Sequence, residues 1–499
     1  MTVRILSAVS ALALLAGTAS AQSLAEQGPE RGEEWREIGR AELAERLERP
    51  RREGRARNVI LFVVDGMGLS TVTAGRIFEG QMQGGMGEDH YLPFERWGHS
   101  ATVKTYTDNA QVADSAATAT ALQAGIKSHN GAISVYPRQT LESCAPDAAL
   151  PATIMQLAEE RGMSTGTVVT ARLTHATPAA GFAHVPHRGW ESDADLPAEA
   201  VEAGCRDIAR QLVEFSHGDG VDVAIGGGLA AFTPEDQGGN RTDGRDLTAE
   251  WVEAGGVFVS NAEELRALDP SSGERVLGLL NRSHLAFEHD RDDAEEPSLA
   301  EMTRFAIENL STNENGYYLM VEAGRVDHAH HGVNAYRAMT DMVALADAVR
   351  AAEEMTDPDE TLMIVTADHS HVFTIAGYPR RGNPLLGLMR PPAPNLGDDP
   401  TPPSPAQDGR PYTTVGYYAG PVQRPRSEDA APLTDEQVQD PDYRQEAAIP
   451  LAVEPHGGED VIAYALGPWA HLVDGVMEQH TLFHIMTHAY GWDREDGAE

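Results

Sequence analysis

The sequence predicts an α/β fold in which a mostly parallel central sheet is flanked by helices. Continuous apolar runs are typical of parallel strands that are buried on both faces. Runs of this kind occupy residues 58–64, 167–170, 221–225, 317–321, 361–366 and 461–466. Helical patterns lie between them, for example at residues 153–161 and 335–354. Alternation of strands with helices is the pattern of an α/β protein.

Two segments precede this α/β region. Residues 1–21 begin with a positive charge at Arg4, continue as a short apolar run and end in Ala-Ser-Ala, which predicts a cleaved signal peptide. Residues 22–55 are polar and charged and predict an N-terminal helical arm, because Trp35, Ile38, Leu43 and Leu47 follow a roughly helical spacing.

The α/β region is interrupted once. Residues 372–452 are dense in Pro and Gly and contain two short strand candidates, at 412–415 and 417–418. Sheet-like sequence then resumes at Val461. We therefore expect one α/β domain made of residues 56–371 and 453–493, with residues 372–452 as an insertion between two of its strands.

Composition limits the functions that the chain can have. With 77 Asp and Glu against 38 Lys and Arg, nucleic acid is not expected as a partner. The apolar run in residues 1–21 is too short to cross a bilayer, so we expect an exported, soluble, periplasmic or extracellular protein without a membrane anchor. Lys104 and Lys127 are the only lysines. Genome composition and adaptation to high salt both explain this shortage, and both remain open here.

The two cysteines, Cys144 and Cys205, are expected to form a disulfide, since exported proteins fold in an oxidising compartment. Two buried free thiols are the alternative.

Acidic residues and histidines follow three of the predicted strands. Asp65 comes after the first, Glu322 after residues 317–321, and Asp368-His369 after residues 361–366. Ligands bind beyond the carboxyl ends of the strands in α/β sheets, so we expect these side chains to gather in one site. A single such Asp is usually only a turn cap, but three strands with histidines nearby favour a functional site.

The ligand types indicate metal ions. Asp327 and His331 stand four residues apart and would face the same side of a helix, with His456 as a third ligand. Asp368 and His369 could bind a second ion together with Asp65. Imidazole with carboxylate suits zinc.

A third set consists of oxygen ligands only. Asp65, Thr177 and Glu322 offer two carboxylates and a hydroxyl, which suits magnesium.

A phosphoryl group fits the remaining features. Ser115 follows Asp114 at the start of an Ala- and Thr-rich run, which predicts a capped helix, and a helix N-terminus favours a phosphoryl group. Arg188 is the candidate for gripping phosphoryl oxygens through two parallel hydrogen bonds. Spacing alone leaves an ordinary surface arginine as an equal alternative.

Six segments, in this order, resemble the signatures of the alkaline phosphatase family: VVDGMG (63–68), VADSAATATAL (112–122), HATPAA (175–180), VEAGRVDHAHH (321–331), TADHSHVF (366–373) and HGGEDV (456–461). The similarity extends over about residues 30–490, and it is greater to the animal-type branch than to the enteric-bacterial one. It implies a phosphomonoesterase that releases inorganic phosphate through a phosphoserine intermediate.

The resemblance also implies roles for individual residues. Ser115 would be the nucleophile and would complete the second zinc site. The first zinc site would consist of Asp327, His331 and His456, the second of Asp65, Asp368 and His369, and the magnesium site of Asp65, Thr177 and Glu322. Arg188 would bind phosphate and Asp114 would orient it. The family is homodimeric, and residues 372–452 resemble the interfacial crown of the animal-type branch.

Two departures stand out. Where the animal-type branch has a calcium site, the acidic positions appear here as Asn281 and Glu296, so no faithful calcium site is expected. His175 and His328 stand beside the expected magnesium site, where the enteric-bacterial branch has Asp and Lys. We expect the ring nitrogen of His175 to make the third site accept zinc as well as magnesium. The alternative is that His175 faces away from the metals and only fills space in the turn.

A phosphodiesterase or another hydrolase of the same metalloenzyme superfamily is the main alternative. Phosphodiesterase relatives typically use Thr as the nucleophile and lack the third metal, so Ser115, Thr177 and Glu322 argue against them. A sulfatase would need a Cys/Ser-x-Pro-x-Arg motif, which the sequence around Ser115 lacks. An acidic metal-binding protein without catalysis is the alternative from another class.

Overall fold

The computed structural model describes residues 28–394, 401–424 and 431–495, so the predicted signal peptide lies outside the described residues. The described chain divides into two compact units, one containing helix α1 (Gly28–Leu47) and the other containing the sheets. Within its own unit, α1 carries exposed side chains at Trp35, Ile38, Leu43 and Leu47. Among the described residues, no helix has both the length and the apolar character needed to cross a membrane.

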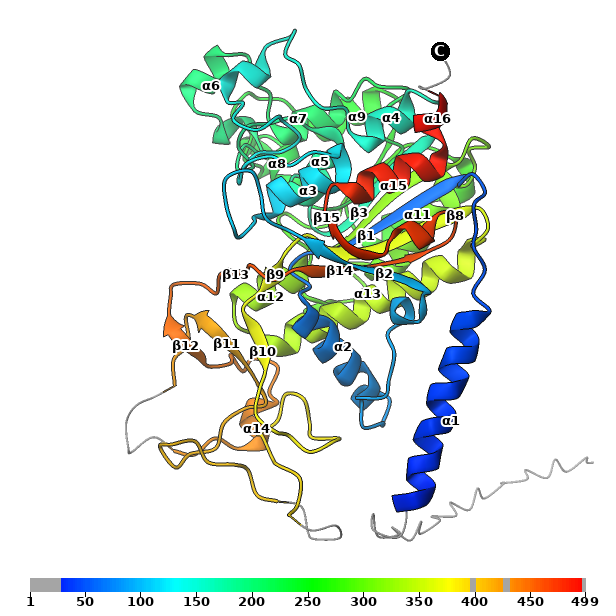
Figure 1. The fold of residues 1–499 in the computed structure, drawn as a ribbon. Coiled ribbons are helices and arrows are strands. Elements are labelled where there is room, and N and C mark those ends of the chain that lie inside the picture. The colour runs from blue at the N-terminus through cyan, green and yellow to red at the C-terminus, as the bar shows by residue number, and fades with distance from the viewer. Residues whose placement is uncertain (1–27, 395–400, 425–430, 496–499) are drawn as a thin grey trace, which may run out of the picture. The chain divides into compact units, whose positions relative to one another are not determined.

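Ten strands of the described chain form the main sheet: β1 (Asn58–Val64), β2 (His99–Lys104), β3 (Ser164–Arg172), β4 (Val223–Gly227), β5 (Val257–Val259), β6 (Val276–Leu279), β7 (Tyr317–Ala323), β8 (Thr361–Ala367), β14 (Val461–Leu466) and β15 (Gly475–Glu478). Their order is β15-β2-β14-β8-β1-β7-β3-β4-β6-β5 (Figure 1). Of these ten strands, only β14 runs antiparallel to both of its neighbours. The predicted mostly parallel sheet is confirmed.

Helices cover both faces of this sheet, which is why its central strands are continuously apolar. The remaining helices are α2 (Leu69–Met82), α3 (Ser115–Ala124), α4 (Ile154–Glu159), α5 (Ala176–Phe182), α6 (Ala198–Glu202), α7 (Ile208–Val213), α8 (Leu229–Phe232), α9 (Leu247–Glu253), α10 (Ala262–Ala267), α11 (Leu299–Leu310), α12 (Arg325–His331), α13 (Ala335–Met355), α14 (Asp435–Val438), α15 (Thr481–Tyr490) and α16 (Trp492–Glu495). Helices α3, α5 and α15 lie on one side, and α2 and α13 on the other (Figure 1). All residues of β7 and β8 are buried.

A small sheet forms from segments within the Pro- and Gly-rich stretch of residues 372–452. It contains β10 (Phe373–Ile375), β11 (Val415–Gly420) and β12 (Ala447–Pro450). The two strand candidates at 412–415 and 417–418 were predicted wrongly as separate strands. Val415 and residues 417–418 belong to the single strand β11, because Gly416 between them continues the ladder opposite Thr374, while residues 412–414 lie outside the strand.

A two-stranded ladder links the end of β8 to the segment before β14. In it, β9 (Ser370–His371) pairs antiparallel with β13 (His456–Gly457), so that His371 lies opposite His456. The chain therefore enters β14 from the edge of the sheet at which the parallel strands end. That entry point explains why β14 runs antiparallel to β8.

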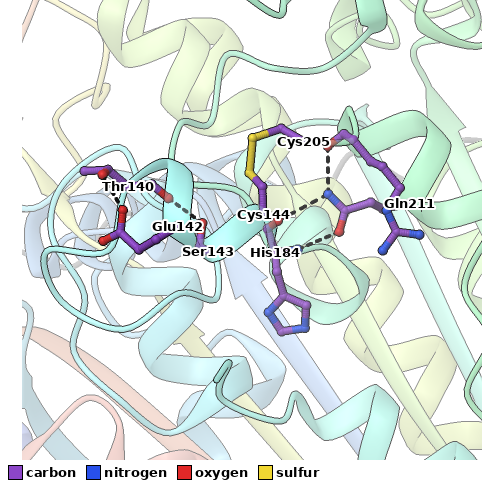
Figure 2. Close-up of a disulfide and its surroundings, with 8 residues drawn as sticks. Thr140, Glu142, Ser143, Cys144, His184, Cys205 and Gln211 are labelled. Carbon is purple, nitrogen blue, oxygen red and sulfur yellow. Dashed lines mark hydrogen bonds between the residues drawn. A yellow bond between two sulfur atoms is a disulfide. The ribbon is translucent and has the colours of Figure 1, made fainter. Parts of the chain in front are cut away.

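The predicted disulfide is confirmed. Cys144 and Cys205 are bonded, with their Cα atoms 4.8 Å apart, and so join two segments 61 residues apart in the sequence (Figure 2). Gln211 of α7 ties the neighbouring loops together, because its Nε2 donates to the carbonyl oxygens of His184 and Arg206. The Cys144–Cys205 disulfide therefore restrains the loop that precedes α7.

Candidate active site

Sheet register brings the strand-end carboxylates together. β1 lies between β7 and β8, and Val63 is opposite both Glu322 and Thr366. Asp65 and Asp368 then follow at the same edge. The first prediction about the site, that these three strands deliver their acidic residues to one place, agrees with this register.

Asp65, Asp368 and His369 form one group of potential metal ligands, and all three are fully buried. The Nε2 atom of His369 lies 3.3 Å from Asp65 Oδ1 and 3.3 Å from Asp368 Oδ2. The backbone N–H of Gly66 donates to Asp368 Oδ1 at 3.0 Å. The Oδ2 atoms of both aspartates are buried without a hydrogen-bond partner.

Ser115 is the first residue of α3 and is directed at this group. Asp114 caps the helix, because its Oδ1 accepts from the backbone N–H of Ala117 at 3.2 Å. Ser115 Oγ lies 3.1 Å from His369 Nε2 and 3.5 Å from Asp65 Oδ1. The cap thus places the hydroxyl at the helix N-terminus and beside two potential ligands.

A second group comprises Asp327, His331, His371 and His456. Asp327 and His331 lie one turn apart on α12, with Oδ1 and Nε2 separated by 3.3 Å. The Nε2 atom of His456 is 3.2 Å from that of His331. The expected triad is therefore together, and His371 adds a fourth residue and a third ring, which donates from Nε2 to Asp327 Oδ1 at 2.7 Å.

The third group contains Asp65, Glu322 and His175. Both carboxylate oxygens of Glu322, the Oγ1 of Thr177 and the Nδ1 of His175 are buried without a hydrogen-bond partner. His175 was expected beside this site, and its ring nitrogen lies within the group itself. His175 directly precedes α5, and Thr177 lies in the first turn of that helix.

Arg188 is not an ordinary surface arginine. Its Nη1 donates to Asp114 Oδ2 at 3.2 Å, and its Nη2 lies 3.0 Å from His175 Nε2. Asp114 Oδ2 also accepts from the backbone N–H of Gly131. Asp114 therefore holds the start of α3 with one oxygen and Arg188 with the other.

Electrostatics in this cluster favour a bound cation. Burial raises the pKa of Asp65 well above its usual value, and the carboxylates of Asp327 and Asp368 add to the effect. Burial also raises the pKa of Asp368, and it raises that of Glu322 to about 8. Burial opposes ionisation of Asp327 too, but hydrogen bonds from His371 and His456 outweigh it and hold its pKa well below the usual range.

The donor chemistry of these groups fits metal ions. Two groups combine carboxylates with imidazoles, a donor set that zinc accepts, and the third is mostly oxygen. Buried carboxylates with unpartnered oxygens and raised pKa values are costly unless positive charge compensates them. Positive ions at these three places would remove that cost.

Two further histidines, His284 and His328, pack around His175 of the third group. The ring of His328 lies 4.2 Å from that of His284 and 5.5 Å from that of His175, measured between centroids. Burial lowers the pKa of all three, to about 4 for His328. His328 thus lies beside the third group, as expected, while His284 was not foreseen.

The calcium position of the animal-type branch takes a different form here. The Nδ2 of Asn281 donates to Glu296 Oε1 at 2.6 Å, and the backbone N–H of Ala286 donates to Glu296 Oε2. Both oxygens of Glu296 therefore accept hydrogen bonds within the protein.

The family profile described as alkaline phosphatase matches residues 56–492, which is most of the chain. This chain belongs to the alkaline phosphatase family. A tissue-nonspecific alkaline phosphatase of Gallus gallus is 40% identical over 496 residues, covering 96% of this chain and 93% of the relative. An alkaline phosphatase of Gadus morhua is 40% identical, covering 88% and 92%. The chain is therefore a phosphoric monoester hydrolase, and its family is metal-dependent.

Solved alkaline phosphatases share the fold. The enzyme of Thermus thermophilus superimposes with a TM-score of 0.63 at 24% identity and covers 89% of this chain and 93% of its own. The enzyme of the Antarctic bacterium TAB5 has a TM-score of 0.60 at 23% identity, covering 88% and 99%. A His-to-Glu variant of the TAB5 enzyme carries magnesium in a site named M3.

Sequence reasoning overlooked His371, Glu454 and His284. His371 lies in β9, whose two residues are too few for a periodic pattern. Glu454 and His284 come from loops whose positions depend on long-range pairing, so the sequence gives no signal for any of the three.

Proposed function

We propose that Ser115 is the nucleophile of this phosphomonoesterase and forms a phosphoserine intermediate. The observation that carries the proposal is the position of its Oγ, which is at the N-terminus of α3, 3.1 Å from His369 Nε2 and 3.5 Å from Asp65 Oδ1. A nucleophilic hydroxyl needs such neighbours, because its own pKa is too high for attack at neutral pH.

The proposed cofactors are two zinc ions and one magnesium ion. Asp327, His331 and His456 would hold the first zinc, and Asp65, Asp368 and His369 the second, with Ser115 completing it. Asp65, Thr177 and Glu322 would hold magnesium. Zinc and magnesium in these places would supply Lewis acidity and compensate the negative charge that develops on the reacting oxygens. Support comes from the three ligand groups and their unpartnered buried oxygens.

The residues divide the reaction between them. The guanidinium of Arg188 donates hydrogen bonds to two non-reacting phosphoryl oxygens, and Asp114 holds the guanidinium in position. Ser115 Oγ gives up its proton and forms a bond to phosphorus as the ester P–O bond breaks, and the leaving alcohol oxygen takes up a proton in exchange. Water then attacks phosphorus and loses a proton, the Ser115 O–P bond breaks, Ser115 Oγ regains a proton, and inorganic phosphate is released. Two inversions give net retention at phosphorus.

Substrate selectivity should be broad, since these contacts grip the phosphoryl group and not the alcohol. The decisive experiment measures hydrolysis of a chromogenic phosphate monoester by purified enzyme before and after chelation, and again after zinc and magnesium are restored. A diester and a sulfate ester of the same alcohol serve as controls. Activity that prefers either control, or that survives complete removal of metal, would overturn the proposal.

The enzyme is further proposed to be exported, periplasmic or extracellular, and homodimeric, with residues 372–452 as a crown-like insertion at the dimer interface. Supporting the interface are exposed apolar side chains on and beside β11 and β12, namely Tyr418, Ile449, Leu451 and Val453. Light scattering on the purified enzyme tests it. A mass of one chain, 53.7 kDa before any cleavage, would contradict the dimer.

A further inference from the structure

Glu454 is a fully buried carboxylate that belongs to none of the ligand groups found among the described residues. Both of its oxygens are used: Oε2 accepts from His371 Nδ1 at 2.5 Å and Oε1 accepts from the backbone N–H of Val372 at 2.8 Å. Its backbone carbonyl oxygen accepts from His331 Nδ1, also at 2.5 Å. One residue therefore contacts two rings of the first metal group, and it stands two positions before a third, His456.

The contact to His371 leads directly to a proposed zinc ligand. His371 faces Glu454 with Nδ1 and Asp327 with Nε2, the latter at 2.7 Å. A ring held at both nitrogens cannot rotate, so Asp327 Oδ1 is fixed in turn. That oxygen lies 3.3 Å from His331 Nε2 and 3.5 Å from His456 Nε2, so the whole first group depends on its position.

We propose that Glu454 is a positioning residue for the first metal site and acts through the chain Glu454–His371–Asp327. This inference rests on the proposed function, because it takes Asp327, His331 and His456 as the ligands of the first zinc. Glu454 also stands two residues after the 372–452 segment, so the contacts through His371 connect the end of that segment to the geometry of the site.

A purely structural role is the alternative reading. A buried carboxylate that pairs with an imidazole can stabilise a fold without influencing a neighbouring metal, and removing it would then lower stability only. The two roles differ in one measurable quantity, the rate at which zinc leaves the folded enzyme. Partners that orient metal ligands typically alter metal affinity by about 10- to 100-fold.

The experiment follows zinc release from the fully loaded enzyme into a chromogenic chelator, at a temperature where circular dichroism shows every variant folded. Glu454→Ala should release one zinc per chain about 10- to 100-fold faster than the wild type. Glu446→Ala is the matched control, because Glu446 is a carboxylate of the same region that pairs with Arg424 and belongs to none of the ligand groups among the described residues. It should release zinc at the wild-type rate.

Two further variants test the chain itself. His371→Ala should accelerate release to a similar extent, and the double variant with Glu454→Ala should be no faster than His371→Ala alone, because both changes break the same chain. Glu454→Gln should lie between wild type and Glu454→Ala. Its amide oxygen can still accept from Val372 while its amino group donates to His371 Nδ1, which leaves the Nε2–H directed at Asp327.

The outcomes separate the inference from the function on which it rests. If His456→Ala fails to accelerate release of one zinc, the assignment of the first site is wrong. If His456→Ala does accelerate it while Glu454→Ala and Glu454→Gln both release zinc at the wild-type rate, the role given to Glu454 is wrong. If Glu454→Ala does not fold, Glu454→Gln is measured alone and in combination with His371→Ala. The double variant should then release zinc no faster than His371→Ala alone, and additive acceleration would show that the role given to Glu454 is wrong.

Discussion

A single side chain of the site can be replaced without breaking the contacts that hold its neighbours in position. Asp114 caps α3 and holds Arg188 through its own carboxylate, and neither contact involves the Ser115 side chain. Ser115→Ala should therefore keep the fold and the metal content while kcat falls by about 10³-fold or more, because the atom that bonds to phosphorus is gone. Steady-state kinetics at saturating monoester, with metal analysis of the same sample, measures both.

A matched control for this change is Ser128→Ala. Ser128 is also fully buried, but its Oγ donates to the carbonyl oxygen of Val135, away from the ligand groups. It should retain most of the turnover. Near-normal turnover in Ser115→Ala would remove the basis for the nucleophile assignment.

His175 determines the expected metal response. Its ring lies in the third ligand group with Asp65 and Glu322, with Nε2 beside Arg188 and Nδ1 free of a hydrogen-bond partner. Burial lowers its pKa, so the ring offers a neutral nitrogen, which zinc accepts more readily than magnesium does. Excess zinc should therefore depress the activity, and magnesium in the millimolar range should restore it.

The variant His175→Asp replaces that nitrogen with a carboxylate and should weaken zinc inhibition by about tenfold, while it lowers the need for added magnesium. Its carboxylate also faces Arg188, so KM for the monoester should change as well. His484→Asp, on the exposed side of α15, makes the same chemical change at a residue that belongs to none of the ligand groups among the described residues, and it should leave the zinc response unaltered. A wild-type enzyme that stays fully active in excess zinc would refute the argument.

At the scale of elements, the strand ends were predictable because burial on both sides forces continuous apolar sequence. Residues 58–64 and 461–466 coincide with β1 and β14, and Asp65 and Asp368 stand where the pattern breaks. The parallel pairing of β1 with β7 then brings Val63 opposite Glu322. The sequence alone therefore shows that acidic residues follow the ends of several strands.

The reversed direction of β14 and the role of His371 could not be predicted. Both depend on the ladder between β9 and β13, which joins residues 85 positions apart, and each strand contains only two residues. Strands so short carry no periodicity. Glu454 is invisible in the sequence for a related reason, since its two acceptor contacts arise only after that ladder forms.

One buried carboxyl at the junction of α4, β3 and β4 should make stability depend on pH. Glu159 ends α4, and its Oε1 accepts from Thr165 Oγ1 at 2.6 Å, while its Oε2 is buried without a hydrogen-bond partner. Burial raises its pKa to about 9, and the neighbouring Asp222 and Asp219 add to the effect. The folded state therefore keeps a proton that the unfolded state releases near pH 4.5.

Protonated Glu159 makes its full contribution to the free energy of unfolding below about pH 4.5. This contribution is lost as the pH rises toward about 9, at up to about 1.4 kcal/mol per pH unit. Glu159→Gln cannot ionise, so its free energy of unfolding should fall less than that of the wild type between pH 6 and pH 9. Denaturant titrations across this range, with metals held constant, measure the difference. Glu160→Gln, next in sequence, is the control, and equal pH slopes in all three proteins would contradict the prediction.

Across the whole molecule, negative charge exceeds positive charge by 39. Both lysines of the chain, Lys104 and Lys127, pair with the same carboxylate, Glu478. Arginine supplies many other ion pairs, and some of these are well protected from solvent. Arg241, for instance, is fully buried and lies 3.0 Å from Asp207. Added salt screens such buried pairs weakly, whereas it screens repulsion between exposed carboxylates strongly.

Activity should therefore persist, or rise, when sodium chloride is increased from 0.1 M to the molar range. The screening length falls from about 10 Å to about 3 Å over that interval, which removes most of the repulsion among exposed acidic side chains. Exposed ion pairs such as Arg304–Glu354 weaken too, but each contributes less than about 1 kcal/mol. Initial rates and thermal midpoints at fixed zinc and magnesium, repeated in potassium chloride, test the balance. Steady inactivation in both salts would show that attraction between opposite charges outweighs self-repulsion, and the shortage of lysine would then reflect genome composition alone.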